Sequence, residues 1–146
     1  MVDREFSFTT DTATMCIYDL ECLKHRLEDD ADWWSIPRVE LEEVNLGNVA
    51  FLGLGDDGSY RVSIADAFEG ATVSTNINAP SGRIFIGAGE EVTSDGLEPE
   101  CIRGGMFLDV EAGHYKIHAR KDRFAIHLSL EKTTISENDH TGLLRL

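Results

Sequence analysis

The sequence predicts an all-β fold, mainly an antiparallel β-sandwich or flattened barrel of about nine strands with one short α-helix near residues 20–27. Short segments in which apolar and polar residues alternate recur along the chain, as in half-buried strands. Turn-forming residues such as Asp57-Gly58 separate these segments. Residues 20–27 carry apolar side chains at helical spacing, which favours a helix there.

Two strands and the helix are expected first. Glu5–Thr9 places two phenylalanines on one face, and Thr14–Tyr18 follows a polar turn. Asp19 is a typical N-cap residue, and leucines follow it three and four residues apart. We therefore expect a helix at Leu20–Leu27, the one convincing helix of the chain.

The middle of the chain contains five alternating segments. They are expected to be strands at Val39–Val44, Val49–Leu54, Tyr60–Ala65, Ala71–Ile77 and Arg83–Gly87. In the first of them Glu40 and Glu42 would point outward. Asp57-Gly58 is a strong hairpin signal, so the second and third should pair with each other. Gly87–Gly105 is expected to be a long surface loop.

Residues 105–132 predict a meander of three antiparallel strands, Met106–Val110, Tyr115–Arg120 and Phe124–Glu131. A turn at Lys121-Asp122 would place Ile117 opposite Ile126, and Ala119 opposite Phe124. A turn at Glu111–His114 would place Leu108 opposite the same Ile117. Both hairpins then bury the same face of the middle strand, and a one-residue slip would expose it.

The rest of the chain is expected to finish this domain. Its leucines, Leu143, Leu144 and Leu146, would add a last strand or cover the core. With no repeat and no boundary signal, 146 residues are expected to form a single β-rich domain spanning 1–146.

The charge balance limits the classes of partner. The 27 acidic residues outnumber the 13 basic ones, which gives a net charge of −14. Such a protein repels nucleic acid and anionic membranes and attracts a basic protein. Alternatively, the charge serves only solubility, which is the interpretation that charge alone favours. The first residues contain no apolar run, so we expect no signal peptide, and no segment approaches the roughly 20 apolar residues of a membrane span. Three cysteines without metal spacing fit free thiols, so we expect a cytoplasmic protein.

The residue pattern does not indicate catalysis. No nucleophile, base and orienting group stand at a recognisable spacing, and Cys16 alternates within a strand. Basic side chains gather on one face of the meander, with Lys116 expected opposite His127, and this competes with metal binding. The patch consists of Lys116, His118, Arg120, Lys121, Arg123 and His127. It indicates charge balance with acidic neighbours or, alternatively, an anion or partner site. We predict no catalytic residue, no metal site and no cofactor.

The strongest candidate for a binding surface joins acids to aromatic residues. Tryptophan is enriched at binding hot spots, and surrounding carboxylates would attract a basic partner. The candidate residues are Asp29, Asp30, Asp32, Trp33 and Trp34, followed by Asp56 and Asp57 and then by the loop Glu90–Glu100. One tryptophan at least is expected to close the core where the helix ends.

Two hairpin sequences carry a resemblance to a known group of proteins. Gly55–Val62 (GDDGSYRV) and Val110–Ile117 (VEAGHYKI) each place an aromatic and an aliphatic residue after a glycine turn. In this and in its acidity, the chain resembles the small β-rich immunity proteins encoded beside bacterial polymorphic toxins, including those of type VI secretion. The resemblance implies an inhibitor that binds a cognate toxin and blocks its active site.

Two other functions remain open from the sequence, as does a role as a subunit of a larger assembly. A β-sandwich that binds a small ligand such as a carbohydrate could use Trp33 or Trp34 as a stacking platform. A metal-dependent enzyme of the cupin type could use His118 or His127. The first predicts an exposed indole ring on a concave face, and the second predicts a cluster of metal ligands.

Overall fold

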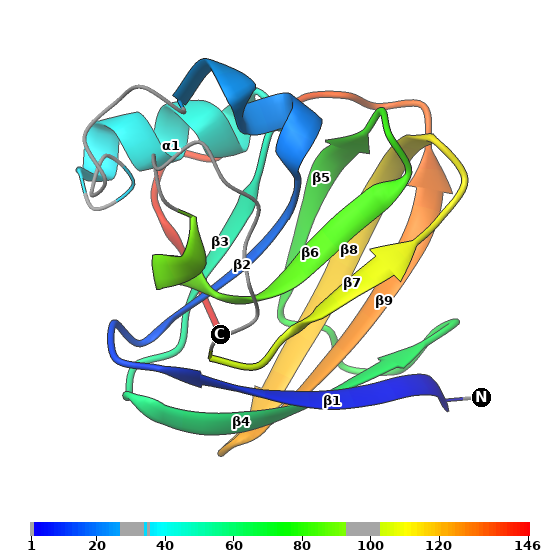
Figure 1. Ribbon diagram of the computed structural model, residues 1–146. Coiled ribbons are helices and arrows are strands. Elements are labelled where there is room, and N and C mark those ends of the chain that lie inside the picture. Colours follow the sequence, from blue (N-terminus) through cyan, green and yellow to red (C-terminus); the bar gives the residue numbers. More distant parts are fainter. Residues whose placement is uncertain (1, 27–33, 35, 93–102) are drawn as a thin grey trace.

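A computed structural model shows two five-stranded β-sheets packed face to face, with helices over one of them (Figure 1). The structure describes residues 2–26, 34, 36–92 and 103–146. Most neighbouring strands are antiparallel, and β4–β9 and β3–β10 are parallel pairs. The β-rich sandwich predicted from the sequence is therefore confirmed.

The sheets interleave strands from the whole chain. Sheet A contains, in spatial order, β1 (Val2–Thr10), β4 (Gly58–Ala65), β9 (Ala125–Thr133), β8 (Gly113–Asp122) and β5 (Val73–Ala79). Sheet B contains β10 (Leu144–Arg145), β3 (Ala50–Gly53), β2 (Thr14–Asp19), β6 (Arg83–Ala88) and β7 (Met106–Asp109). The helical segments are η1 (Leu20–Arg26), α1 (Pro37–Asn45) and η3 (Gly89–Glu91).

Sheet B has apolar side chains on both of its faces, because sheet A covers one face and the helical segments cover the other. Its inner face meets sheet A in a core that includes Ile17, Leu52, Val62, Ile117 and Leu128. Its outer face forms a second core with the helical segments, which includes Tyr18, Leu23, Val44, Phe51 and Phe85. Strands buried on both faces lose the clean period of two, as β6 does with five consecutive buried residues.

The helices differ from the sequence expectation in type and in place. The helical segment predicted at residues 20–27 is present, but it is the 3₁₀ helix η1. Asp19 accepts a hydrogen bond from the backbone N–H of Glu21 at 3.0 Å, as expected of a cap. The strand predicted at Val39–Val44 is wrong, because these residues lie in α1. Pro37 in the first turn and Gly47 after the last one are typical helix boundaries.

The predicted hairpin around Asp57-Gly58 is also wrong. β3 pairs with β2 in sheet B, whereas β4 pairs with β1 and β9 in sheet A. The chain therefore crosses from one sheet to the other between Gly53 and Gly58. A local turn signal identifies the bend but not the partners of the strands that flank it.

The predicted meander is correct for one of its two hairpins. β8 and β9 pair as predicted, but the turn between them lies at Arg123-Phe124 and not at Lys121-Asp122. As a result, Ala119 lies opposite Leu128, which is four residues beyond the expected partner Phe124. An even slip keeps the same face buried, so the apolar face of β8 is as predicted. β7 does not pair with β8. It pairs with β6 in the other sheet, where Leu108 faces Ile84.

The segment after β9 contacts the edge of each sheet in turn. Asn138 accepts a hydrogen bond from the N–H of Asn76 at 2.8 Å, which covers the edge of β5. β10 then adds to the edge of β3, so the expected last strand is present. No helix in the described parts of the chain has the length and apolar character needed to cross a membrane.

Candidate functional site

Of the five residues predicted to form the acidic–tryptophan surface, the structure describes only Trp34. Asp29, Asp30, Asp32 and Trp33 lie outside the described residues. The ring of Trp34 stacks on Phe51, with ring centroids 5.9 Å apart and planes at 22°. Trp34 is partly buried against the second core. This tryptophan therefore helps to close the core, as expected for at least one of the two.

Asp56 and Asp57 are exposed in the connection between β3 and β4. The phenolic O–H of Tyr60 donates a hydrogen bond to the carbonyl of Asp56 at 2.6 Å and so fixes this connection. Burial of the hydroxyl, then the charges of Asp56 and Asp57, raise the pKa of Tyr60, so it remains a donor. The main chain beside the two exposed carboxylates is thus tied to β4.

Phe124 is an exposed aromatic residue beside this bend that the sequence analysis placed in a buried strand. Its side chain is 51% exposed. Its ring lies over Gly58, where a Cβ atom would be 3.1 Å from Phe124 Cε1, and its centroid is 5.1 Å from that of Tyr60. Asp56, Asp57 and Phe124 therefore form one surface feature, which we call the acidic tip.

A cleft of about 250 Å³ lies next to the acidic tip. Phe51 forms part of its wall, and the ring of Trp34 stacks on Phe51. Gly55, the residue before Asp56, forms another part of the wall. The predicted residues Trp34 and Asp56 are therefore adjacent to the walls of one cleft. The lining residues are Thr12, Ala13, Thr14, Glu40, Phe51, Gly53, Gly55, Leu143, Leu144 and Arg145. We call it the Glu40 cleft.

Glu40 is the unusual group in this cleft. Its carboxyl is half-buried, and this burial raises its pKa to about 7, although the positive charge of Arg145 opposes the rise. Near neutral pH the carboxyl thus keeps its proton more readily than an exposed glutamate does. A carboxyl with such a shift in a cleft is a typical feature of binding and catalytic sites.

Replacement of Glu40 by glutamine should change how stability depends on pH. The unfolded chain loses the Glu40 proton near pH 4.5 and the folded chain near 7. Between these values the folded state binds more protons, so stability falls as pH rises. Glu40→Gln should match the parent at pH 4 and exceed it at pH 8 by about 1 kcal/mol, reduced because solvent reaches the carboxyl. Thermal unfolding at both pH values measures this.

The exposed Glu42 on the same helix provides the matched control for that experiment. Glu42→Gln should leave the pH dependence of unfolding as it is in the parent. Parallel stability curves for the parent and Glu40→Gln would show that the Glu40 carboxyl ionises normally.

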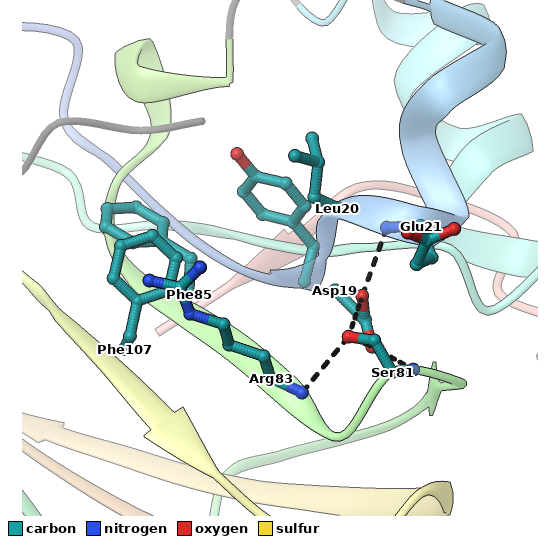
Figure 2. A pocket seen from close by; sticks show the side chains of 8 residues that line it. Asp19, Leu20, Glu21, Ser81, Arg83, Phe85 and Phe107 are labelled. Atoms are coloured by element: carbon teal, nitrogen blue, oxygen red, sulfur yellow. Dashed lines mark hydrogen bonds between the residues drawn. The ribbon is translucent and has the colours of Figure 1, made fainter. Parts of the chain in front are cut away.

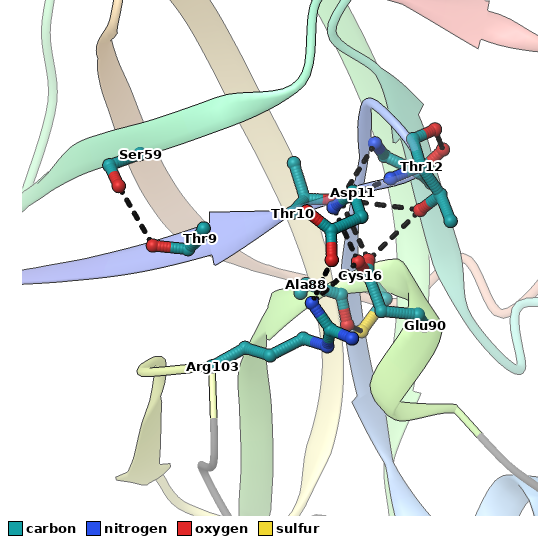
Figure 3. A network of polar contacts seen from close by, with 10 residues as sticks. Thr9, Thr10, Asp11, Thr12, Cys16, Ser59, Ala88, Glu90 and Arg103 are labelled. Atoms are coloured by element: carbon teal, nitrogen blue, oxygen red, sulfur yellow. Dashed lines mark hydrogen bonds and ion pairs between the residues drawn. The ribbon is translucent and has the colours of Figure 1, made fainter.

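A network of polar contacts holds the β1–β2 turn against η3 (Figure 3). Glu90 accepts hydrogen bonds from the Asp11 N–H at 2.6 Å and from the hydroxyls of Thr10 and Thr12 at 2.7 and 2.9 Å. Burial alone would raise the pKa of Glu90, but these hydrogen bonds outweigh it and lower the pKa. Arg103 pairs with Asp11 at 2.6 Å. Glu90, which begins the predicted loop surface, is therefore a structural residue, and residues 93–100 lie outside the described ones.

A second pocket, of about 270 Å³, opens on the outer face of sheet B (Figure 2). Phe85 and Phe107 line it, and the Arg83 guanidinium lies 3.9 Å from the centroid of the Phe107 ring. The carboxylate of Asp19 is already bound, since it accepts hydrogen bonds from the N–H and the hydroxyl of Ser81 at 2.8 Å. This pocket thus has an aromatic wall and the cation of Arg83, while the carboxylate of Asp19 is occupied by hydrogen bonds within the protein.

The histidines of sheet A are paired with other side chains. His118 contacts Ser74 at 2.9 Å and Glu131 at 3.2 Å. His127 lies opposite Arg120, not Lys116 as predicted, and 3.8 Å from Asp122. Three of the six basic residues, His118, Arg120 and His127, therefore have acidic neighbours, and both interpretations of the patch stay predictions for the other three. Within the described ranges, no three His, Cys, Asp or Glu side chains are grouped to hold a metal ion.

Cys16 is buried beneath the β1–β2 turn. Its thiol donates to the carbonyl of Ala88 at 3.3 Å. Burial, reinforced by the charges of Glu91 and Glu90, raises the pKa of the thiol well above its usual value. A thiol that stays protonated is a poor nucleophile, so Cys16 has a packing role.

Comparison with known proteins identifies a family and a shared fold. Residues 1–146 match a family described as "Family of unknown function (DUF6386)". No curated protein sequence matches the chain. The solved structure described as "Crocagin biosynthetic gene J" is similar with a TM-score of 0.55 and 15% identity, over 90% of this chain and 99% of that one. ComJ from Bacillus subtilis, described as the inhibitor of the DNA degrading activity of NucA, is similar with a TM-score of 0.55 and 8% identity, over 91% and 99%.

Proposed function

We propose that this chain, which belongs to the DUF6386 family of unknown function, is a non-enzymatic inhibitor that binds a cognate protein toxin. The observation that supports this most is the fold shared with ComJ along nearly the whole of both chains, because ComJ is an inhibitor of an enzyme. The resemblance to immunity proteins, found from the sequence, points the same way. The toxin would be produced by the same bacterium, with type VI secretion as one route of delivery.

The charge of the chain supports a mechanism for the encounter. A net charge of −14 attracts a target with a basic surface and accelerates association with it. Nucleic acid would be repelled, which leaves a protein as the partner. The inhibitor would act in the cytoplasm, where the target would otherwise be active, and would need no cofactor.

Two surfaces would contact the target. One is the acidic tip with Asp56 and Asp57, whose conformation is fixed by Tyr60 and Phe124 before binding. A preorganised surface loses little conformational entropy on binding. The other surface consists of Asp29, Asp30, Asp32, Trp33 and Trp34. Together they would cover the active site of the toxin and exclude its substrate.

The two alternative functions receive less support from the described residues. The Trp34 ring stacks on Phe51 of the protein itself, so one of its two faces is occupied, and Trp33 lies outside the described residues. His118 and His127 have Glu131 and Asp122 as neighbours and belong to no group of three metal-ligating side chains in the described chain. Inhibition by binding therefore remains the better explanation.

Co-expression with the protein encoded in the neighbouring reading frame tests the proposal. Expression of that protein alone should stop growth, and this chain should restore growth and co-purify with it as a stoichiometric complex. The isolated complex should lack the catalytic activity of the free toxin. Growth arrest that this chain does not relieve, with no complex on gel filtration, would contradict the proposed function.

A further inference from the structure

We propose that the Glu40 cleft is the pocket that receives one arginine or lysine side chain of the inhibited protein. The source of this side chain rests on the proposed function, whereas the binding of a cation in the cleft does not. The inference draws on the size of the cleft, the state of its carboxyl and the charges around its opening.

The cleft has the size and walls for one long side chain. Its volume of about 250 Å³ is below the roughly 300–1,000 Å³ of pockets for drug-sized ligands. Phe51 and Leu144 provide apolar surface for the methylene groups of the entering side chain. Gly53 and Gly55 carry no side chains that would fill the space.

The Glu40 carboxyl is placed to meet the charged end. Among the described residues it has no hydrogen-bond partner and no ion-pair partner, although it is half-buried. An unpaired carboxylate in such a position is destabilised by the loss of water, and a cation would relieve this cost. Burial thus leaves Glu40 with a binding capacity that the fold does not use.

Arg145 is the other charged residue that lines the cleft. It lies on β10, close enough for its charge to act on Glu40 but without forming an ion pair with it. The β1–β2 turn contributes Thr12 and Ala13, and β2 contributes Thr14. β3 contributes Phe51 and Gly53, and none of these five residues carries a charge at neutral pH. Arg145 therefore competes with an entering cation, and its removal should strengthen binding.

Acidic residues adjoin, in sequence, the turn residues that line the cleft. Asp56 follows the lining residue Gly55, and Asp11 precedes the lining residue Thr12. Glu90 lies next to Asp11, with which it shares a hydrogen bond. Arg103 offsets the charges of Asp11 and Glu90, which it contacts at 2.6 and 3.5 Å. Asp56 has no ion-pair partner among the described residues, so its carboxylate favours a cation over an anion in the cleft.

The test uses N-acetylargininamide, which carries a guanidinium as its one charge, titrated into the isotope-labelled protein at pH 8. The backbone signals of Thr12, Thr14 and Gly53 should shift and saturate, and the pKa of Glu40, followed by its carboxyl carbon signal, should fall. Glu40→Gln should weaken binding about tenfold, and Arg145→Ala should strengthen it several-fold, as expected for interactions of one charge. Glu42→Gln, on the same helix but outside the cleft, should bind as the parent does.

Three results of the titration would overturn the inference. Shifts that spread over the acidic surface without saturation would mean non-specific attraction. Equal affinities of Glu40→Gln and Glu42→Gln would exclude Glu40, and saturation of the same signals by acetate would show an anion site centred on Arg145. Because no toxin is present in this titration, a saturable cleft combined with failed inhibition would reject the proposed function alone. Successful inhibition with a silent cleft would reject this inference alone.

Discussion

Replacement of Asp19 by alanine is expected to lower the free energy of unfolding by about 3 kcal/mol. The side chain is 1% exposed and joins three elements. Its carboxylate accepts hydrogen bonds from Glu21 in η1 and from Ser81 in the turn between β5 and β6 (Figure 2). Alanine would leave the partly buried N–H groups of Glu21 and Ser81 without these acceptors, and loss of a partner costs more than the hydrogen bonds themselves contribute.

Urea unfolding of the purified variants measures this loss. Asp109→Ala removes an exposed carboxylate from β7 and should stay within about 0.5 kcal/mol of the parent. Ser81→Ala removes one hydroxyl but keeps the backbone N–H bonded, so it should cost about 1 kcal/mol. An Asp19→Ala variant as stable as Asp109→Ala would mean that water replaces the carboxylate in the folded protein.

The strands were predictable because their signal is local. β1, β2, β5, β6, β8 and β9 all lie where alternation indicated strands. The pairing was not predictable, because it depends on which sheet each strand enters. Neither the Asp57-Gly58 bend nor the turn after β7 reveals that the chain changes sheets there.

The helix α1 and the Glu40 cleft were missed for one shared reason. In Val39–Val44 apolar residues alternate with acidic ones. If this segment were a strand, Glu40 and Glu42 would lie together on its solvent side. A helix turns about 100° per residue and so separates them. Glu42 is exposed, while Glu40 turns toward β3 and β10. Pro37 and Gly47 were the available signals of this helix.

The acidic tip was predicted in part. Exposure of Asp56 and Asp57 follows from the turn preference of Asp-Gly, which holds whichever strands are joined. Phe124 was assigned to a buried face because its apolar side chain fits the alternation of β9. Only the register of β8 and β9 shows that it occupies the turn, beside a bend that is distant in sequence.

Reversal of both charges of the acidic tip, in Asp56→Lys/Asp57→Lys, is expected to slow association with the toxin about tenfold at low salt. The two carboxylates are exposed at a fixed position, so they act on the approach of a basic partner more than on the packed complex. The dissociation rate should change less than the association rate. Stopped-flow measurements at several salt concentrations should show the difference disappear as screening increases.

The control must carry the same change in net charge at another place. Two exposed aspartates are suitable. Asp66 follows β4 at the end of the strand opposite Gly58, and Asp139 lies in the segment before β10. Asp66→Lys/Asp139→Lys should slow association only slightly, because those charges lie away from the tip. If both double variants slow association equally, the total charge of −14 steers the partner and the acidic tip has no special part. A tenfold difference between them would locate the first contact at Asp56 and Asp57, with the Glu40 cleft next to it.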